Sequence, residues 1–151
     1  MFDADAFTEA AKRSCPLYEY LGLDGVRVTD AEFEARMPLT RDSGNHVGIM
    51  HAGALFAVGE LMGGLVVARY LEDPQKFQPV VRQVRIDFRA PALTAVTARA
   101  SFSSGQGASM NRALSDTGRF DFELTTRIFD EGGAVVAQTA ASYAIRNFTG
   151  A

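Results

Sequence analysis

The 151-residue chain, of which 47% is hydrophobic, is long enough for one domain with a substantial buried core. Its net charge is −3 and its 15 basic residues are scattered, which does not indicate a nucleic-acid-binding protein. The single cysteine, Cys15, excludes an internal disulfide and a multi-cysteine zinc site. The chain shows neither a signal-peptide pattern nor an uncharged apolar run of 18 residues, so we expect a cytoplasmic protein that does not cross a membrane.

The N-terminal part predicts a short helical cap followed by a hairpin. Residues 3–14 have the pattern of an amphipathic helix, and Pro16 interrupts it before a further helical turn that ends at Gly22. Residues 26–28 and 32–39 alternate in the manner of two strands, with a turn at Asp30 and Ala31. We expect the cap to pack on the body of the domain.

The stretch from residue 43 to residue 70 is the most informative part of the sequence. A polar, glycine-containing loop leads into a helix from Ala52 to about Tyr70, and Glu60 is the only ionisable residue between positions 52 and 68. A helix that is apolar nearly all round belongs inside a fold, and a carboxylate buried there without partners would cost several kcal/mol. The mid-helix pair Gly63–Gly64 suggests that something packs closely against this helix.

The second half of the chain predicts four further strands and no further helix. Residues 80–90 alternate, with the side chains of positions 80, 82, 84, 86 and 88 expected on one face; residues 95–102, 119–129 and 134–146 are the other strands. A glycine–serine-rich loop is expected at 103–107, and Asp130–Gly133 is a strong hairpin turn signal. The whole predicts one α+β domain over residues 1–151, with an antiparallel sheet of five to six strands wrapped around one long central helix.

Four segments carry a resemblance to a known family. The chain resembles the hotdog-fold acyl-CoA thioesterases, specifically their phenylacetate-pathway-like (PaaI-like) branch, over most of its length from about Pro16 to Ile145. The matching segments are Pro16–Gly22, the N-x-x-G-x-x-H-x-G spacing from Asn45 to Gly53, Ala90–Ala92 and the Asp130–Gly133 turn. In that family an acidic residue lies nine positions after the loop histidine, the place that Glu60 occupies after His51.

The resemblance implies hydrolysis of an acyl-CoA thioester without a metal or other cofactor. Backbone N–H groups at a helix start suit the developing oxyanion, which makes those of Ala52 and Gly53 candidates; the resemblance favours Ala52. Glu60 would act as general base or nucleophile, and Asn45 would orient the water or the carbonyl. Eight residues of helix span about 12 Å, too far for Glu60 and Ala52 of one chain to share a thioester. The resemblance therefore implies a homodimer, further assembled into a homotetramer, in which Glu60 faces Ala52 of the other subunit.

Each assignment has a plainer alternative. Glu60 could point outward or pair with an arginine, and Asn45 could only shape a turn. His51 could fix the loop through a local hydrogen bond instead of taking part in catalysis. His46, His51 and Glu60 match no metal-site spacing. Three departures from the family pattern also stand out: Ala52–Gly53 replaces two glycines, Glu60 replaces the more common aspartate, and glutamines, among them Gln83, lie where relatives carry a serine or threonine.

The substrate contacts are less closely specified. Basic or polar residues expected near the phosphates or the pantetheine arm of coenzyme A are Arg82, Gln83, Arg85, Arg89, Arg112 and the 103–107 loop with Gly105, although each arginine could equally lie on a solvated strand face. The acyl pocket is expected to be lined by Leu55, Phe56, Met62, Tyr18 and Tyr20, with Gly53 at its mouth. Two other functions stay open: a non-catalytic acyl-CoA-binding protein, and an acyl dehydratase that would use His51 as its base.

Overall fold

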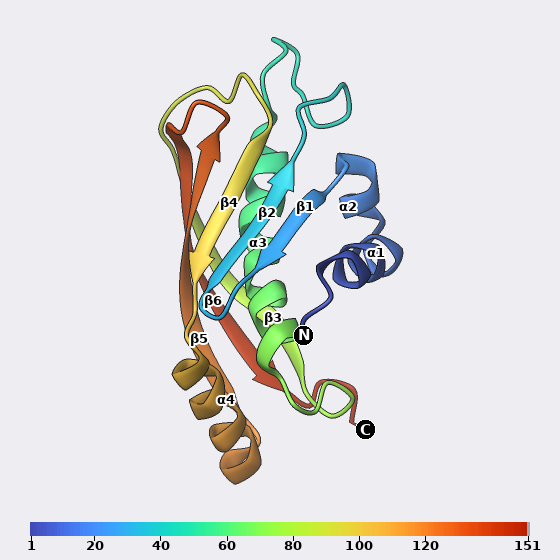
Figure 1. Cartoon of the computed structure of the whole chain (residues 1–151), viewed down its shortest axis with the longest axis vertical. Helices are drawn as coiled ribbons and strands as arrows, with labels where there is room; N and C mark the ends of the chain where they lie inside the picture. The colour runs from blue at the N-terminus through green and yellow to red at the C-terminus, as the bar shows by residue number, and fades with distance from the viewer. Residues whose placement is uncertain (151) are drawn as a thin grey trace.

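The computed structural model describes residues 1–150 and contains one antiparallel sheet with helices on one face and at one end (Figure 1). In chain order the elements are α1 (Ala4–Ser14), α2 (Pro16–Leu21), β1 (Asp24–Val28), β2 (Glu32–Met37), α3 (Ala52–Tyr70), β3 (Gln78–Phe88), β4 (Val96–Ser101), α4 (Ser104–Thr117), β5 (Phe120–Asp130) and β6 (Val135–Arg146). The six strands lie in the order β1-β2-β4-β5-β6-β3, so β1 and β3 are the edges. The predicted α+β fold, a sheet around one long helix, is confirmed.

Helix α3 forms the centre of the core. Its side chains pack on the face of the sheet that carries Phe33, Met37, Ile128 and Ile145, all of which are fully buried. Length and hydropathy alone would let α3 cross a membrane, but 61% of its most apolar window is buried inside the fold, as in the core helix of a globular domain.

Only one member of the Gly63–Gly64 pair is required for packing within the chain. A Cβ atom at Gly63 would overlap the ring of Tyr143 on β6, so this glycine allows the helix and the strand to touch. A Cβ atom at Gly64 would have no neighbour within 4 Å. The close packing expected at both glycines therefore holds for Gly63 alone.

The N-terminal helices form the expected cap beside β1 (Figure 1), and α2 reaches α3 through the hydrogen bond from Tyr18 to Glu60. Asp3 caps α1 through its side chain, and α1 has no fully buried residue. Helix α2 begins with Pro16 at its first position and ends at Gly22, whose φ of 81° is left-handed. These two residues fix the short helix that carries Tyr18.

Two expectations about the second half of the chain are wrong. Residues 103–107 are not a loop: Ser103 and Gln106 form a capping box that starts α4, which ends at the left-handed Gly118 and projects beyond the end of the sheet (Figure 1). The expectation of one continuous alternation along β3 is also wrong, because a bulge between Val81 and Gln83 shifts its phase; after the bulge, Val84 and Ile86 share the core-facing side as expected. Val81, Val84 and Ile86 pack against the core, whereas Val80 is exposed.

Candidate functional site

Glu60 lies in the third turn of α3 and its carboxylate has a partner. The hydroxyl of Tyr18, from α2, donates a hydrogen bond of 2.8 Å to Glu60 Oε2. The hydroxyl of Tyr143, from β6, donates to the backbone carbonyl of Glu60 at 2.9 Å. A phenol therefore stabilises the carboxylate, and the pairing with an arginine considered above does not occur among residues 1–150.

Both phenols are held in their protonated form. Burial, followed by the negative charge of Glu60, raises the pKa of Tyr18 well above its ordinary value, and the hydrogen bond to the carboxylate adds to this shift. The pKa of Tyr143 is raised by the same two causes, burial first. At neutral pH both hydroxyls thus remain hydrogen-bond donors toward Glu60.

The Glu60 carboxylate opens into a mainly apolar hollow of about 440 Å³. Its walls come from α1, α2, α3, β3 and β6; the lining residues used below are Phe7, Ala10, Ala11, Tyr18, Glu60 and Gly64. An anionic group at the edge of an apolar hollow can act on a neutral substrate whose apolar part fills the remaining space. This is the first half of the candidate site.

The N-terminus of α3 forms the second half. His51 is the N-cap residue, and its Nδ1 accepts a hydrogen bond of 2.8 Å from the Gly53 N–H. That bond occupies the Gly53 donor and fixes the imidazole ring, as expected for a structural histidine. The N–H of Ala52, by contrast, has no hydrogen-bond partner within residues 1–150 and lies at the positive end of a 19-residue helix.

The loop before α3 presents Asn45 beside this free N–H. The Asn45 Oδ1 accepts hydrogen bonds from the backbone N–H groups of Val47 at 3.0 Å and Ile49 at 3.3 Å. Asn45 therefore does shape a turn, and its side-chain amide nitrogen has no hydrogen-bond partner within residues 1–150. Asn45 and Ala52 line a common hollow of about 410 Å³ together with residues 88–92.

A buried serine holds this loop in place. Ser43 is fully buried, and its hydroxyl donates to the Pro38 carbonyl at 2.6 Å and accepts from the Thr40 N–H at 2.9 Å. Its carbonyl accepts from the His51 N–H at 2.8 Å, which ties the loop directly to the helix start.

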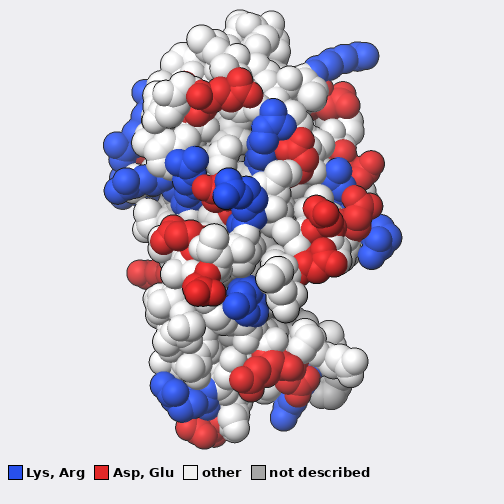
Figure 2. Space-filling model, in the orientation of Figure 1, with Lys and Arg blue, Asp and Glu red and all other residues white. Residues whose placement is uncertain are grey.

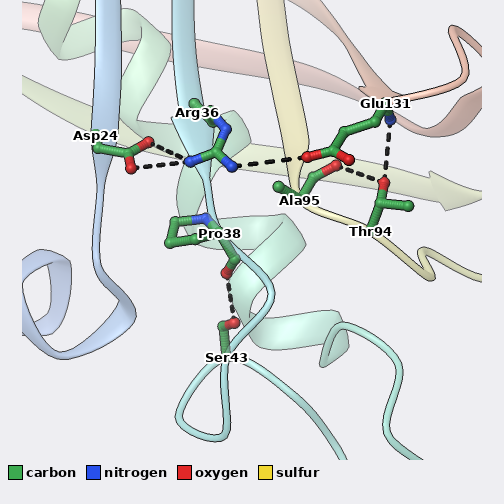
Figure 3. A network of polar contacts seen from close by, with 7 residues as sticks. All are labelled: Asp24, Arg36, Pro38, Ser43, Thr94, Ala95 and Glu131. Atoms are coloured by element: carbon green, nitrogen blue, oxygen red, sulfur yellow. Dashed lines mark hydrogen bonds and ion pairs between the residues drawn. The ribbon is translucent and has the colours of Figure 1, made fainter.

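Ion pairs close the same end of the sheet. Figure 3 shows Arg36 of β2 between the carboxylates of Asp24 and Glu131, with Thr94 accepting from the Glu131 N–H. Because these charges are largely exposed, we expect them to order the strand ends more than they stabilise the fold.

Glu60 and Ala52 do not meet within one chain. The two hollows share no lining residue, and eight residues of helix separate the two groups by about 12 Å. The helix therefore presents a carboxylate and an amide donor as two separate half-sites.

The residues expected around the acyl group are dispersed. Tyr18 lines the hollow with Glu60, as expected, and Leu55 lines the hollow with Ala52. Met62 is fully buried in the core, while Phe56 and Tyr20 are 40% and 60% exposed. Phe56 is unusual as a large exposed aromatic residue on an otherwise buried helix.

Of the residues expected near coenzyme A, only Arg89 lines a half-site of the same chain, the hollow with Asn45 and Ala52; Arg82, Gln83, Arg85, Gly105 and Arg112 line neither hollow. Arg82 pairs with Asp121 at 3.5 Å and Arg85 with Asp87 at 3.4 Å. Gln83 and Arg85 line a shallow hollow with outward-facing residues of β5 and β6, and Gly105 lies in the first turn of α4. Figure 2 shows acidic and basic side chains interspersed over the visible face, with no dominant basic patch.

Three other residues considered above are exposed. Arg89 contacts Gln138, Arg112 contacts Ser109, and His46 is exposed in the loop before α3. Within residues 1–150 no group of three or more His, Cys, Asp or Glu side chains could hold a metal ion.

Sequence reasoning missed the two tyrosines as partners of Glu60. Tyr18 was expected only as a pocket wall, and Tyr143 was not singled out. Tyr18 and Tyr143 lie 42 and 83 positions from Glu60 in the sequence, and no local pattern indicates contacts over such separations. The available signal was the uncompensated carboxylate itself, which demands a donor from elsewhere in the fold.

The antiparallel sheet wrapped around α3 is the hotdog fold. The chain belongs to the family described as a domain of unknown function, DUF4442, whose model matches residues 4–145. No match is found among curated proteins.

Solved structures share this fold over nearly their whole length. A probable thioesterase from Pseudomonas aeruginosa, PA5026, is 27% identical, with a TM-score of 0.84 and 96% of each chain covered. The thioesterase HI1161 from Haemophilus influenzae is 19% identical, with a TM-score of 0.76 and coverage of 99% of this chain and 94% of that one. The thioesterase PA1618 from Pseudomonas aeruginosa, solved as a point mutant, is 20% identical, with a TM-score of 0.76 and coverage of 97% of this chain and 95% of that one. At these identities the last two comparisons establish the fold alone.

Proposed function

We propose that this protein hydrolyses a thioester to a free acid and a thiol. The observation that carries the proposal is the pairing on one helix of a phenol-stabilised carboxylate in an apolar hollow with an unpaired amide N–H at the helix start. The similarity to a solved probable thioesterase at 27% identity supports the same reaction.

In this reaction Glu60 acts as general base toward a water molecule. The carboxylate takes a proton from the water as its oxygen attacks the thioester carbonyl carbon. The Ala52 N–H stabilises the resulting oxyanion, helped by the helix dipole, and the side-chain amide of Asn45 is the second donor that we propose for the same oxygen. The carbon–sulfur bond then breaks, and the proton held by Glu60 passes to the departing thiolate. Direct attack by Glu60 through an anhydride is the alternative route from the same residue.

On this mechanism the two half-sites require a second subunit. We propose a homodimer in which Glu60 of one subunit faces Ala52 and Asn45 of the other, with any pairing of dimers into a homotetramer made through other surfaces. Edge strand β3 supports the dimer, because its 11 residues leave one row of backbone groups unpaired within the described chain and carry the exposed apolar residues Val80 and Phe88. An antiparallel β3–β3 contact would extend the sheet across a twofold axis.

The thiol we propose is coenzyme A, with an acyl group of the kind handled by the phenylacetate-pathway-like branch. In a dimer the exposed Arg82, Gln83 and Arg85 would lie close to the subunit boundary, because β3 is an edge strand. Phosphate groups at a protein surface prefer such arginines. The dehydratase alternative is weakened by His51, whose Nδ1 already accepts the Gly53 N–H.

The test is thiol release from a panel of acyl-CoA thioesters by the wild type and by Glu60→Gln. We expect Glu60→Gln to lose most of the activity and to remain dimeric by light scattering. Glu19→Gln, at an exposed glutamate of α2, is the matched control and should keep wild-type activity. Equal rates for the wild type and Glu60→Gln would refute the role of Glu60, and retained acyl-CoA binding without any release would identify a binding protein.

A further inference from the structure

The hollow at Glu60 is lined by a glycine, Gly64, that packing within the chain does not require. Gly63 and Gly64 are adjacent in the middle of α3, where glycine is a poor helix former. Gly63 is required because a Cβ atom there would strike Tyr143, but a Cβ atom at Gly64 would meet nothing within 4 Å. The absence of a side chain at Gly64 thus leaves space open instead of allowing a contact.

Gly64 lies on the same helix face as Glu60. Residues four apart on a helix are neighbours one turn along, about 6 Å apart along the axis. Both residues line the 440 Å³ hollow, and Tyr18 holds the carboxylate at one side of it. The open space therefore continues along α3 from the proposed reacting group.

The opposite wall of this hollow is also made of small and apolar side chains. Helix α1 contributes Phe7, Ala10, Ala11 and the small Ser14, whose hydroxyl donates to the Ala10 carbonyl, and none of the residues of α1 is fully buried. No charged residue other than Glu60 lines the hollow within residues 1–150. Such walls suit an apolar group and disfavour a polar or charged one.

We infer that the apolar chain of the acyl group lies along α3 from Glu60 over Gly64, beneath α1, and that Gly64 sets the length of chain accepted. The inference rests on the proposed function and deepens it by naming the substrate class: acyl groups with an apolar chain long enough to extend one helical turn from Glu60, past Gly64. An acetyl group would stop short of Gly64. A side chain at position 64 would then fill the space that a longer chain needs.

The experiment measures kcat/KM across acetyl-, butyryl-, hexanoyl-, octanoyl- and decanoyl-CoA for the wild type, Gly64→Ala and Gly64→Leu. We expect the wild type to prefer the longer members. Gly64→Leu should lower kcat/KM for octanoyl-CoA by at least about tenfold while leaving that for acetyl-CoA within about twofold, since one misplaced methylene already changes discrimination by that order. Gly64→Ala should show a smaller change in the same direction.

Two further measurements separate a substrate effect from damage to the fold. The melting temperature of Gly64→Ala should equal or exceed that of the wild type, because alanine favours the helix and meets no neighbour. Gly132→Ala, in the exposed turn between β5 and β6 and outside the hollow, is the matched glycine control and should not alter the chain-length profile.

Binding of non-hydrolysable S-alkyl-CoA thioethers of the same chain lengths tests the inference independently of turnover. The inference is supported if affinity rises with chain length in the wild type and loses that dependence in Gly64→Leu. This holds even if no thioester is hydrolysed, because absence of hydrolysis would remove only the hydrolase proposal. Hydrolysis with a chain-length profile that Gly64→Leu leaves unchanged would overturn the inference and leave the hydrolase proposal standing.

Discussion

Replacing Ala52 with proline removes the backbone N–H that the proposed mechanism uses to bind the oxyanion, and it changes little else in the structure. Ala52 is the first residue of α3, a position at which proline is well tolerated because the N–H there has no partner within the helix. His51 has φ −64° and ψ 142°, the extended conformation that a residue before proline adopts. The side chain of Ala52 is exposed, so the pyrrolidine ring displaces no core residue.

The expected magnitude follows from the loss of one oxyanion donor. Removing such a donor lowers kcat by about 10²–10³, equivalent to roughly 2.7–4 kcal/mol of transition-state stabilisation. We therefore expect Ala52→Pro to lose about that factor in thiol release from acyl-CoA, with KM changed much less. Its melting temperature should remain close to that of the wild type.

The control at the same position is Ala52→Gly, which keeps the N–H and should keep the rate within a few fold. Both variants are assayed with the best substrate of the panel, and their folding is compared by thermal unfolding. A kcat for Ala52→Pro equal to that of the wild type would show that the Ala52 N–H does not bind the oxyanion.

Three further predictions follow from the contacts around Glu60. Tyr18→Phe removes a half-buried hydrogen bond to a carboxylate, worth about 1.5 kcal/mol, and should lower kcat about tenfold. The control Tyr20→Phe, at an exposed tyrosine, should leave kcat unchanged, and equal losses in both variants would argue against a specific role of the Tyr18 hydroxyl. Gly63→Ala forces a methyl group into the ring of Tyr143 and should lower the free energy of unfolding, measured by urea titration, by about 2 kcal/mol, because overpacking outweighs the gain in helix propensity. An unchanged free energy of unfolding would mean that the ring can move aside. Because the pKa values of Tyr18 and Tyr143 are raised in the folded state, both phenols stay protonated there after the unfolded chain begins to ionise. The free energy of unfolding should therefore be fully present below about pH 10 and fall above it, with a shallower fall in Tyr18→Phe. Identical slopes for the variant and the wild type would contradict this linkage.

The sequence predicts the central helix and the hairpins well, because their signals are local. An almost uncharged segment bounded by a polar loop and by Pro74 marks α3 at Ala52–Tyr70, and the Asp130–Gly133 turn marks the β5–β6 hairpin. The same local logic failed at α4. Two glycines among serines suggested a loop, while the capping box of Ser103 and Gln106 and the buried Met110 and Leu114 one turn apart carried the helix signal.

The candidate site was only partly predictable, for a different reason. The roles proposed for Asn45, Ala52 and Glu60 depend on local position, so a loop–helix pattern could indicate these residues. The hydrogen bond from Tyr18, the contact with Tyr143 and the open space over Gly64 arise from elements that meet only in three dimensions. The β3 bulge likewise redirects Arg82 and its neighbours, and alternation in the sequence does not reveal a bulge.

The central claim is that each site combines Glu60 of one subunit with Ala52 of the other, and subunit mixing tests it most directly. Glu60→Gln and Ala52→Pro are each expected to be nearly inactive as homodimers. In a mixed dimer, one site would join the intact Glu60 of one chain with the intact Ala52 of its partner. After unfolding and refolding an equimolar mixture, half of the dimers should be mixed, and thiol release should recover to about a quarter of the wild-type rate. A mixture that forms mixed dimers, shown with differently tagged chains, but stays as inactive as either parent would contradict the shared site.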